Sequence, residues 1–503
     1  MLHRAGIKNF KPFQSQQNIV GKPITLIYGP NSGGKSSIIQ SLMLLKQSVE
    51  NQSTSKMALS PRGDYVDLGS FRSMVHQHDM SREISFELSF DIIRPKEPSL
   101  AALFPEDCTQ TVGLVFGVDS PESSNHGICK LRQVNYKLQA LNRQTLLDVQ
   151  LVPSEETPNS LTLRPSRLHG AAQLFTWKTQ ADRESFAKFC LGLEDVISTA
   201  YPSCLTRFSD SQQGQQELSS EGLQTLLSHM GVVLDGPLPS KLIALDTEQT
   251  QGAENALMNN IQFRVLEALM SEYSQLFSAM SYLGPLRSYP ARYYVASTHS
   301  QTSVGKRGEH TAQMLFHSPA VCKDRINEWF EKFEIPYSLS FREIGDEVTG
   351  SIISLILQDH RTGVSVAPSD VGFGIGQLLP ILVEGMASHK QILCVEQPEI
   401  HLHPRLQAHL ADFFIETSRP GSAHASSNQW LIETHSEALV LRLQRRIREG
   451  VIKPEDISIL YVQPGKHGSQ VLELSLDEEG HFLDEWPDGF FEESYDELFG
   501  GGL

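Results

Sequence analysis

A glycine-rich loop near the N-terminus has the residue types and spacing needed to bind phosphate. Residues 29–36 read GPNSGGKS, which fits the pattern G-x-x-x-x-G-K-[ST] at every fixed position. Backbone N–H groups of such a loop surround an anion, and the following helix adds its positive dipole end. Lys35 would reach the β- and γ-phosphates, and the Ser36 hydroxyl would be a ligand of Mg²⁺. The chemistry indicated is binding and turnover of a nucleoside triphosphate with magnesium.

The flanking segments agree with this interpretation. Ile24, Leu26 and Ile27 form an apolar run that predicts a strand before the loop, and residues 37–45 predict a helix after it. A glycine-rich turn before an ordinary helix is the alternative, and it does not account for the complete strand–loop–helix order. The residues that we expect to bind the nucleotide here are Asn31, Ser32, Gly33, Gly34, Lys35, Ser36 and Ser37.

Two later segments predict strands that end in polar residues. Residues 391–396 (QILCVE) read as a buried strand ending in Glu396, and an acid at a strand's carboxyl end lies at the ligand crevice of an open α/β sheet. Glu396 is therefore our candidate for the acid that holds Mg²⁺ through water. Residues 430–436 (WLIETHS) predict another short strand that ends in a polar cluster containing His435. Alone, His435 would read as an ordinary histidine; after a phosphate loop and an acid-tipped strand, we favour a sensor of the γ-phosphate.

A second glycine-rich segment, residues 369–380 (SDVGFGIGQLLP), precedes the acid-tipped strand. Its glycines open a predicted helix and offer another set of N–H groups to an anion. Taken by itself, this pattern is better explained as an ordinary helix start.

Composition limits the class of protein. The chain has 503 residues, 40% hydrophobic and 20% charged, which is typical of a globular protein of about two to four domains. No run reaches the ~18 apolar residues of a membrane span, and the first residues lack the apolar stretch of a secretion signal. The six cysteines are scattered without a C-x-x-C pair, which favours a cytoplasmic location. A net charge of −17 argues against a general binder of polyanions.

The pattern along the chain predicts one α/β nucleotide-binding domain split by a large insertion. Strand-like alternation covers residues 83–93, and weaker strand signals recur to about residue 152. From about 184 to 280 the pattern predicts helices, and strand signals return at 351–358. We divide the chain into an N-terminal half of the ATPase domain, an inserted α+β region, a C-terminal half and an acidic extension, at residues 1–83, 84–280, 281–445 and 446–503.

Together these segments resemble the ABC-type ATPases, in the branch that contains chromosome-maintenance proteins, RecF and the OLD nucleases. GPNSGGKSS is similar to the Walker A loop, VEQPEIHLHP to Walker B and the D-loop, and ETHSE to the switch-histidine loop. DVGFGIGQLLPIL looks like the signature helix, which in this superfamily faces the γ-phosphate bound by the other subunit. The resemblance covers residues 1–75 and about 280–445, including YLGPLR at 282–287, and it implies a P-loop fold with a mixed β-sheet.

The resemblance also assigns roles. ATP and Mg²⁺ are the implied cofactors, and Gly374, Gly376 and Gln377 are the implied nucleotide contacts of the signature helix. The implied assembly is a homo-oligomer of at least two chains around ATP.

Two positions depart from the family pattern. Gln397 stands where the catalytic glutamate is usual, and a glutamine orients the attacking water without being a good base; this predicts slow hydrolysis, with Glu399 or Glu433 assisting. Gly376 stands where the signature serine is often found. The catalytic residues that we expect are thus Glu396, Gln397, His435 and Glu399, with Ser36 and Glu396 at the metal.

Many relatives in this branch are ATPase subunits of antiphage systems such as Septu and PARIS, which partner a separate nuclease. The chain therefore resembles a cytoplasmic ATPase that senses or controls a nuclease or other effector, and no nuclease domain is evident in its own sequence. The alternative is a RecF-like repair ATPase that binds DNA; a transporter motor fits the large insertion less well, and we expect no membrane partner.

The C-terminal part holds two further candidates for partner contacts. The basic segment 441–448 either contacts nucleic acid or forms a solvated face. In the acidic segment 484–499, Phe491, Tyr495 and Phe499 form a stripe that we expect to complete the protein's own core, with a docking surface as the alternative. Residues 486–493 (WPDGFFEE) also resemble the end of a bacterial subfamily of ATPases of unknown function.

Overall fold

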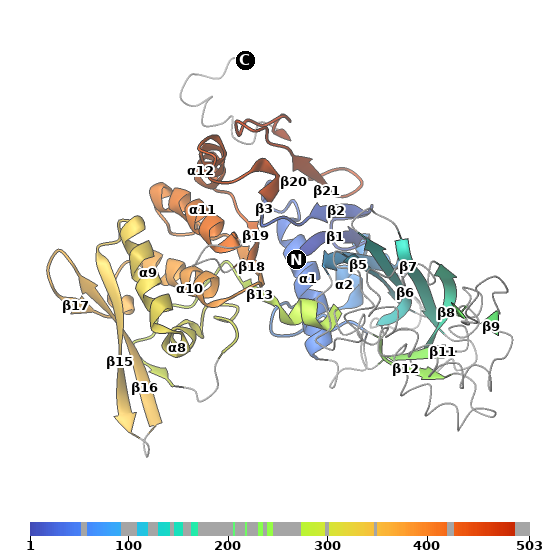
Figure 1. Ribbon diagram of the computed structural model, residues 1–503, viewed down its shortest axis with the longest axis horizontal. Helices are drawn as coiled ribbons and strands as arrows, with labels where there is room; N and C mark the ends of the chain where they lie inside the picture. The colour runs from blue at the N-terminus through green and yellow to red at the C-terminus, as the bar shows by residue number, and fades with distance from the viewer. Residues whose placement is uncertain are drawn as a thin grey trace, which may run out of the picture. The chain divides into compact units, whose positions relative to one another are not determined.

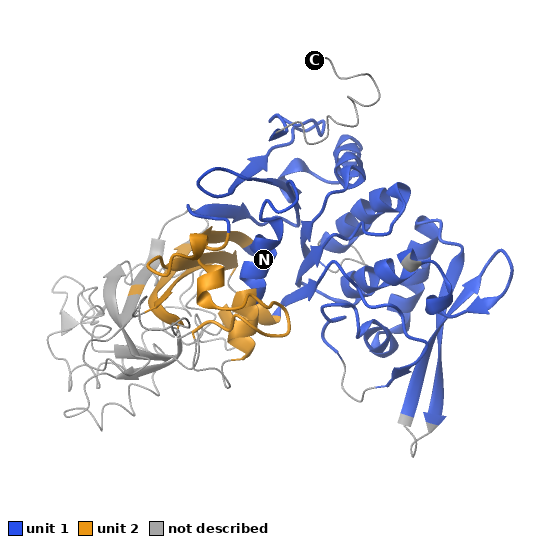
Figure 2. Cartoon of the chain, turned by 180° about the vertical axis from the view of Figure 1, so that it is seen from behind, with its two compact units in different colours: residues 1–2, 12–43, 279–503 blue, residues 3–11, 44–278 orange. Residues whose placement is uncertain are grey.

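A computed structural model gives the fold (Figure 1). It forms two compact units, one of residues 1–2, 12–43 and 279–503 and the other of residues 3–11 and 44–278 (Figure 2). The residues that the structure describes are 1–51, 58–91, 108–118, 129–140, 145–153, 162–169, 205–206, 217–218, 230–234, 239–244, 273–296, 301–346, 350–419 and 427–487.

The first unit is built on a sheet whose central strands are parallel. Five strands run in parallel and a sixth is antiparallel at one edge. The three central strands are buried along their whole length, which suits near-continuous apolar runs in a parallel sheet. In sheet order the strands are β13 (Met280–Leu283), β18 (Ile392–Glu396), β19 (Gln429–Glu433), β3 (Ile24–Tyr28), β20 (Ile457–Gln463) and β21 (Gln470–Leu474).

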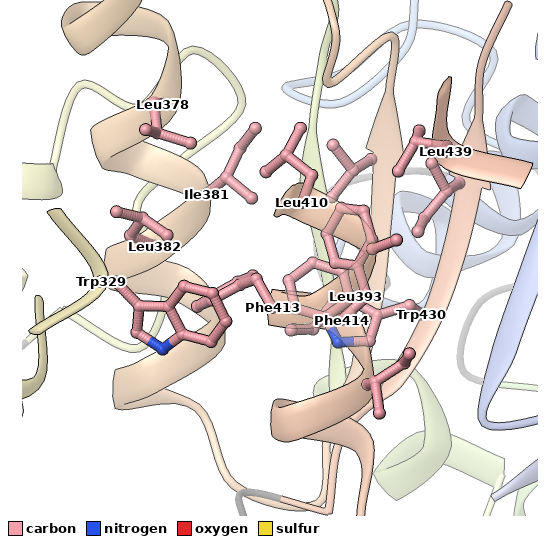
Figure 3. Close-up of a cluster of buried hydrophobic side chains, with 14 of the residues drawn as sticks. Trp329, Leu378, Ile381, Leu382, Leu393, Leu410, Phe413, Phe414, Trp430 and Leu439 are labelled. Carbon is pink, nitrogen blue, oxygen red and sulfur yellow. The ribbon is translucent and has the colours of Figure 1, made fainter. Parts of the chain in front are cut away.

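Helices pack against this sheet and supply much of the core. The largest core side chains are aromatic (Figure 3): the Phe413 and Trp329 ring centroids lie 5.1 Å apart, and those of Phe414 and Trp430 lie 4.7 Å apart. Trp430 satisfies its indole N–H by donating to Thr417 Oγ1 at 2.9 Å. The helices of this unit are α8 (Thr311–His317), α9 (Ala320–Lys332), α10 (Phe373–Ala387), α11 (Pro404–Ser418) and α12 (Glu437–Arg448), with short 3₁₀ turns η4 (Pro368–Asp370) and η5 (Pro454–Asp456).

A smaller antiparallel sheet also belongs to this unit. Its two long strands form a hairpin (Figure 1), and two short strands both pair with the second of them. In one long strand, Ile353, Leu355 and Leu357 are buried and alternate with more exposed residues, as expected for a sheet with one packed face. The strands of this smaller sheet are β14 (Tyr294–Val295), β15 (Tyr337–Asp346), β16 (Gly350–Asp359) and β17 (Ser365–Val366). Strand β2 (Gln17–Val20) belongs to the same unit but not to this sheet.

The second unit contains a long sheet in which the strand pairs from β12 to β4 are antiparallel. In β4, every second residue is buried from Ile84 to Phe90. In sheet order the strands are β12 (Pro239–Ala244), β11 (Met230–Leu234), β8 (Thr162–His169), β7 (Thr145–Pro153), β6 (Cys129–Ala140), β5 (Cys108–Val118), β4 (Ile84–Asp91) and β1 (Leu2–Lys8). Among the described residues of this unit, further elements are β9 (Leu205–Thr206), β10 (Glu217–Leu218), α2 (Phe71–Met74) and η1 (His76–His78). Helix α1 (Lys35–Glu50) begins in the first unit and ends in this one.

Most strands predicted from the sequence are confirmed, but the helical prediction for 184–280 is wrong for four segments. Strands β9, β10, β11 and β12 lie in that range, whereas residues 273–278 are helical. Short apolar runs such as MGVVL in β11 do not distinguish a strand from a buried helix by periodicity alone. The sequence between β11 and β12 contains Asp235-Gly236, a hairpin signal that should have favoured strands.

None of the helices among the described residues combines the length and the apolar character needed to span a bilayer.

Candidate nucleotide-binding site

The phosphate loop has the predicted structure. β3 ends at Tyr28 and α1 begins at Lys35, with the loop between them. Gly29 and Gly34 have φ values of 141° and 109°, in the region that favours glycine. A Cβ atom at Gly29 would lie 2.5 Å from the Val462 carbonyl oxygen, and one at Gly34 would lie 2.4 Å from Pro12 Cγ. The two glycines are therefore required by the backbone and by the space around it.

The Lys35 ammonium lies inside the loop. Its side chain is buried, with 4% of the residue exposed, and Nζ donates to the carbonyl oxygens of Gly29 and Pro30, each at 2.9 Å. Burial lowers the pKa of Lys35, while the charges of Glu433 and Glu399 act in the opposite direction. A phosphate oxygen entering the loop would compete with these two carbonyls for the ammonium.

The remaining predicted residues of the loop lie in one continuous turn. Asn31 and Ser32 are exposed, and Ser32 has a left-handed φ of 63°. Gly33 is buried, and its N–H donates to the Pro30 carbonyl oxygen at 3.2 Å. Ser37 N–H donates to the Gly34 carbonyl oxygen at 3.0 Å. Local hydrogen bonds thus set the curvature that surrounds an anion in such loops.

Two acids meet at the carboxyl edge of the sheet. β18 and β19 pair in parallel with Glu396 opposite Glu433, and β19 pairs with the phosphate-loop strand with Glu433 opposite Ile27. Ser36 Oγ donates to Glu433 Oε1 at 3.1 Å. The expected metal ligand Ser36 is therefore in contact with Glu433, which we expected from the sequence only to assist hydrolysis.

Glu396 lies beside this contact and is buried. Its Oε1 accepts a hydrogen bond from the Tyr282 hydroxyl at 3.1 Å. Burial, and then the charge of Glu433, raises the pKa of Glu396 to about 7; the Tyr282 hydrogen bond and the charges of Lys306 and Arg287 act against that rise. A divalent cation at this edge would favour the ionised form of the carboxyl group.

The turn after Glu396 is held by an arginine that the sequence did not single out as a site residue. Gln397 has a left-handed φ of 45°, and its N–H donates to the Glu433 carbonyl oxygen at 2.7 Å. Arg287 donates from Nη2 to the Glu396 carbonyl oxygen at 2.9 Å and from Nη1 to that of Gln397 at 3.3 Å. Arg287 is 4% exposed, and burial lowers its pKa to about 10. The only sequence signal for this role was its place in the segment YLGPLR, which resembles a segment of the family.

Glu399 organises the histidine loop. Its two carboxylate oxygens accept from the Thr434 hydroxyl at 2.8 Å and from the His435 N–H at 2.7 Å. Burial raises the pKa of Glu399. The half-buried His435 ring has a lowered pKa, first because of burial and then because of the Lys35 charge. The Lys35 charge therefore acts on His435, which lies near enough to the phosphate loop to feel it. Direct assistance by Glu399 in catalysis stays a prediction.

The second glycine-rich segment forms the first turn of α10, as expected. A Cβ atom at Gly376 would lie 2.9 Å from Pro290 Cδ and Cγ, and one at Gly374 would lie 3.1 Å from the His401 carbonyl oxygen. Gln377 is 1% exposed, and its Nε2 has no hydrogen-bond partner among the described residues. Close packing against Pro290 explains why a serine is absent at position 376.

The predicted basic segment is the second half of α12, and several of its charges are paired. Arg446 binds Asp412 through Nε at 2.6 Å and Nη2 at 3.0 Å, and Arg445 binds Glu449 at 2.7 Å. These pairs favour the interpretation as a solvated face. The aromatic stripe at Phe491, Tyr495 and Phe499 lies outside the described residues.

The residues at this edge fit the magnesium ion of a P-loop site. No group of three His, Cys, Asp or Glu side chains suited to a metal occurs within the part of the chain that the structure describes. Mg²⁺ beside a nucleotide needs no such group, because waters and phosphates supply most of its ligands. The buried Glu433 Oε2 lacks a hydrogen-bond partner among the described residues, so it is available to the ion or to its waters.

Comparisons with known families agree with this geometry. Family models described as an AAA ATPase domain and an AAA domain match residues 252–440 and 5–91, and a family of unknown function matches residues 452–499. No curated protein matches the sequence at a significant level. The family matches and the phosphate-loop geometry support an ATPase domain with a mixed α/β P-loop fold.

Solved head domains of Smc proteins are similar at low identity. The head domain from Pyrococcus furiosus, bound to the C-terminal domain of ScpA, is 11% identical, with 99% of this chain and 98% of that chain covered and a TM-score of 0.38. The head domain from Thermotoga maritima is 10% identical, with 94% and 99% covered and a TM-score of 0.35. The one from Pyrococcus yayanosii is 10% identical, with 95% and 98% covered and a TM-score of 0.39.

Proposed function

We propose that this chain binds Mg-ATP in the loop at residues 29–37 and hydrolyses it slowly. The observation that carries the proposal is the convergence of Lys35, Ser36, Glu396 and Glu433 at one edge of a parallel sheet. Lys35 supplies the charge for the phosphates, while Ser36 and the two acids supply oxygens for magnesium.

Slow turnover follows from the residue after Glu396. Gln397 orients a water through its amide but accepts a proton poorly, so positioning and charge neutralisation carry the reaction. Its backbone is fixed by Arg287 and by the Glu433 carbonyl oxygen, which favours orientation over proton transfer.

We further propose that two copies enclose the nucleotide. The start of α10, with Gly374, Gly376 and Gln377, would face the γ-phosphate bound by the other copy. Support comes from the N-terminus of this 15-residue helix, whose N–H groups and dipole favour an anion. ATP would then hold the assembly together, and turnover would release it.

The proposed biological role is control of a separate nuclease or other effector in prokaryotic antiphage defence. This role rests on the resemblance to ATPase subunits of such systems. We assign the partner surface to the inserted region 84–280, between the ATPase halves at 1–83 and 281–445, with an acidic extension at 446–503. The paired arginines of α12 and the net charge of −17 give the DNA-binding alternative less support.

The decisive experiment measures mass by light scattering with and without Mg-ATP. We expect a monomer-to-oligomer shift in the wild type, none in Lys35→Ala, and a normal shift in Lys453→Ala, which removes an exposed lysine elsewhere. Phage challenge of cells with the chain and its neighbouring gene should then show protection that Lys35→Ala abolishes. A wild type that binds no nucleotide would refute the ATPase; salt-dependent duplex binding strengthened by ATP would favour the DNA-binding alternative.

A further inference from the structure

The hydrogen bond between Ser36 and Glu433 fixes the direction in which the Ser36 hydroxyl proton points. A serine hydroxyl has one proton to donate and two lone pairs to offer. Ser36 Oγ donates that proton to Glu433 Oε1 at 3.1 Å, so its lone pairs remain free for a cation. Without an acceptor at this place, the hydroxyl could rotate and turn its proton toward the metal.

The second oxygen of Glu433 is also available. Glu433 is 3% exposed, and its Oε2 has no hydrogen-bond partner among the described residues. A buried carboxylate oxygen without a donor is costly unless a ligand or water satisfies it. Waters bound to a magnesium ion are strong donors, and they would lie next to the Ser36 hydroxyl.

The strand order explains why Glu433, and not Glu396, takes this place. β19 lies between β18 and β3, so the acid that ends β19 is the neighbour of the phosphate loop. Glu396 ends the next strand and accepts from Tyr282. The acid nearest to the metal-binding serine therefore comes from the strand that precedes the histidine loop.

We propose that Glu433 is a positioning residue of the magnesium site: it would orient the Ser36 hydroxyl as a ligand and accept a hydrogen bond from a metal-bound water through Oε2. The inference rests on the proposed function, since it concerns the magnesium ion that accompanies ATP. It assigns to Glu433 the contact with Ser36 that the sequence pattern would give to Glu396.

The test is the magnesium dependence of nucleotide binding, measured with a fluorescent ATP analogue in EDTA and across a Mg²⁺ titration. For Glu433→Gln we expect the Mg²⁺ midpoint to rise by about 10–100-fold, as is usual for residues that support metal ligands. In EDTA the same variant should bind ATP as tightly as the wild type or more tightly, because one negative charge near the phosphates is gone. Glu437→Gln, four residues further on in the first turn of α12, should change neither value.

A double-mutant cycle tests the route of the effect. Ser36→Ala should also raise the Mg²⁺ midpoint, and adding Glu433→Gln to it should raise the midpoint little further, because both changes remove the same contact. Electron paramagnetic resonance of bound Mn²⁺ gives a second readout, and Glu433→Asp, which keeps the charge, covers the case in which Glu433→Gln does not fold.

The outcomes separate this inference from the proposed function. An unchanged Mg²⁺ midpoint in Glu433→Gln, or a loss of ATP affinity that is equal with and without magnesium, would overturn the role of Glu433 while leaving the ATPase intact. A wild type that binds ATP in neither condition would overturn both.

Discussion

Replacing Gly376 with serine would restore the residue that is usual in the ABC-type signature, and we expect it to destabilise this protein. The added Cβ would lie 2.9 Å from both Cδ and Cγ of Pro290. Optimal carbon–carbon contacts are about 3.5–4.0 Å, and the closed proline ring cannot rotate out of the way. The loop around Pro290 is also held, because the Tyr289 hydroxyl donates to the Ser369 carbonyl oxygen at 2.6 Å and Arg292 pairs with Asp370.

The expected loss follows from two opposing terms. Overpacking a well-filled site typically costs about 1–3 kcal/mol. Gly376 lies in the first turns of α10, and serine in place of a helical glycine returns about 0.5 kcal/mol of helix propensity. The steric term is the larger one, so the free energy of unfolding should fall by about 0.5–2.5 kcal/mol.

Urea unfolding of the wild type, three single variants and one double variant measures this effect. Gly372→Ala is the control: it adds a Cβ at the N-cap of the same helix, where no atom beyond its chain neighbours lies within 4 Å. It should cost only the N-cap preference of glycine over alanine, about 0.5 kcal/mol. Pro290→Ala removes the ring atoms, so the Gly376→Ser loss should largely disappear in the double variant. If Gly376→Ser is as stable as the wild type, or if its loss persists without Pro290, the steric explanation is wrong.

Three further predictions concern Arg287, Gln397 and Glu384, a buried acid of α10. Arg287→Met should lower the free energy of unfolding by about 1–3 kcal/mol, because it leaves two buried carbonyl oxygens without their donor. It should also lower ATP turnover but not nucleotide affinity, and a turnover equal to that of the wild type would contradict this role. Gln397→Glu should raise the steady-state ATPase rate at least about tenfold by supplying a base, whereas an unchanged rate would show that proton transfer is not limiting. Burial raises the pKa of Glu384, so the folded protein retains a proton that the unfolded chain loses above about pH 4.3. Stability should therefore fall as pH rises toward the folded pKa, and Glu384→Gln should remove that part of the slope in urea unfolding at pH 5 and pH 8.

The elements of the nucleotide site could be predicted because each carries a local signal. β3 (ITLIY) and β18 (ILCVE) are mostly apolar strands of five buried residues, as is typical of a parallel sheet, and a turn with left-handed backbone conformations follows each of them. The start of α10 at Phe373 was likewise marked by glycines. Strands β11 and β12 were missed because short apolar runs carry no period that excludes a helix.

The partners of the predicted residues could not be derived in the same way, because strand order decides them. Ser36 and Glu433 are 397 residues apart, and nothing in the local pattern states that β19 lies between β18 and β3. Arg287 was missed for the same reason, since its hydrogen bonds reach residues 109 and 110 positions away.

One short segment, residues 282–292, connects the acid-tipped strand to the start of α10. Tyr282 donates to the Glu396 carboxylate, Arg287 binds the backbone of the turn that follows, and the Pro290 ring packs against Gly376. Arg287 and Pro290 are three residues apart, so a side chain at position 376 that displaces Pro290 must also disturb the bonds that hold the turn at Gln397. The Gly376→Ser variant should therefore lose ATP turnover as well as stability, and both should recover together when Pro290 is replaced by alanine. Recovery of stability without turnover would show that the segment packs the two elements without coupling them.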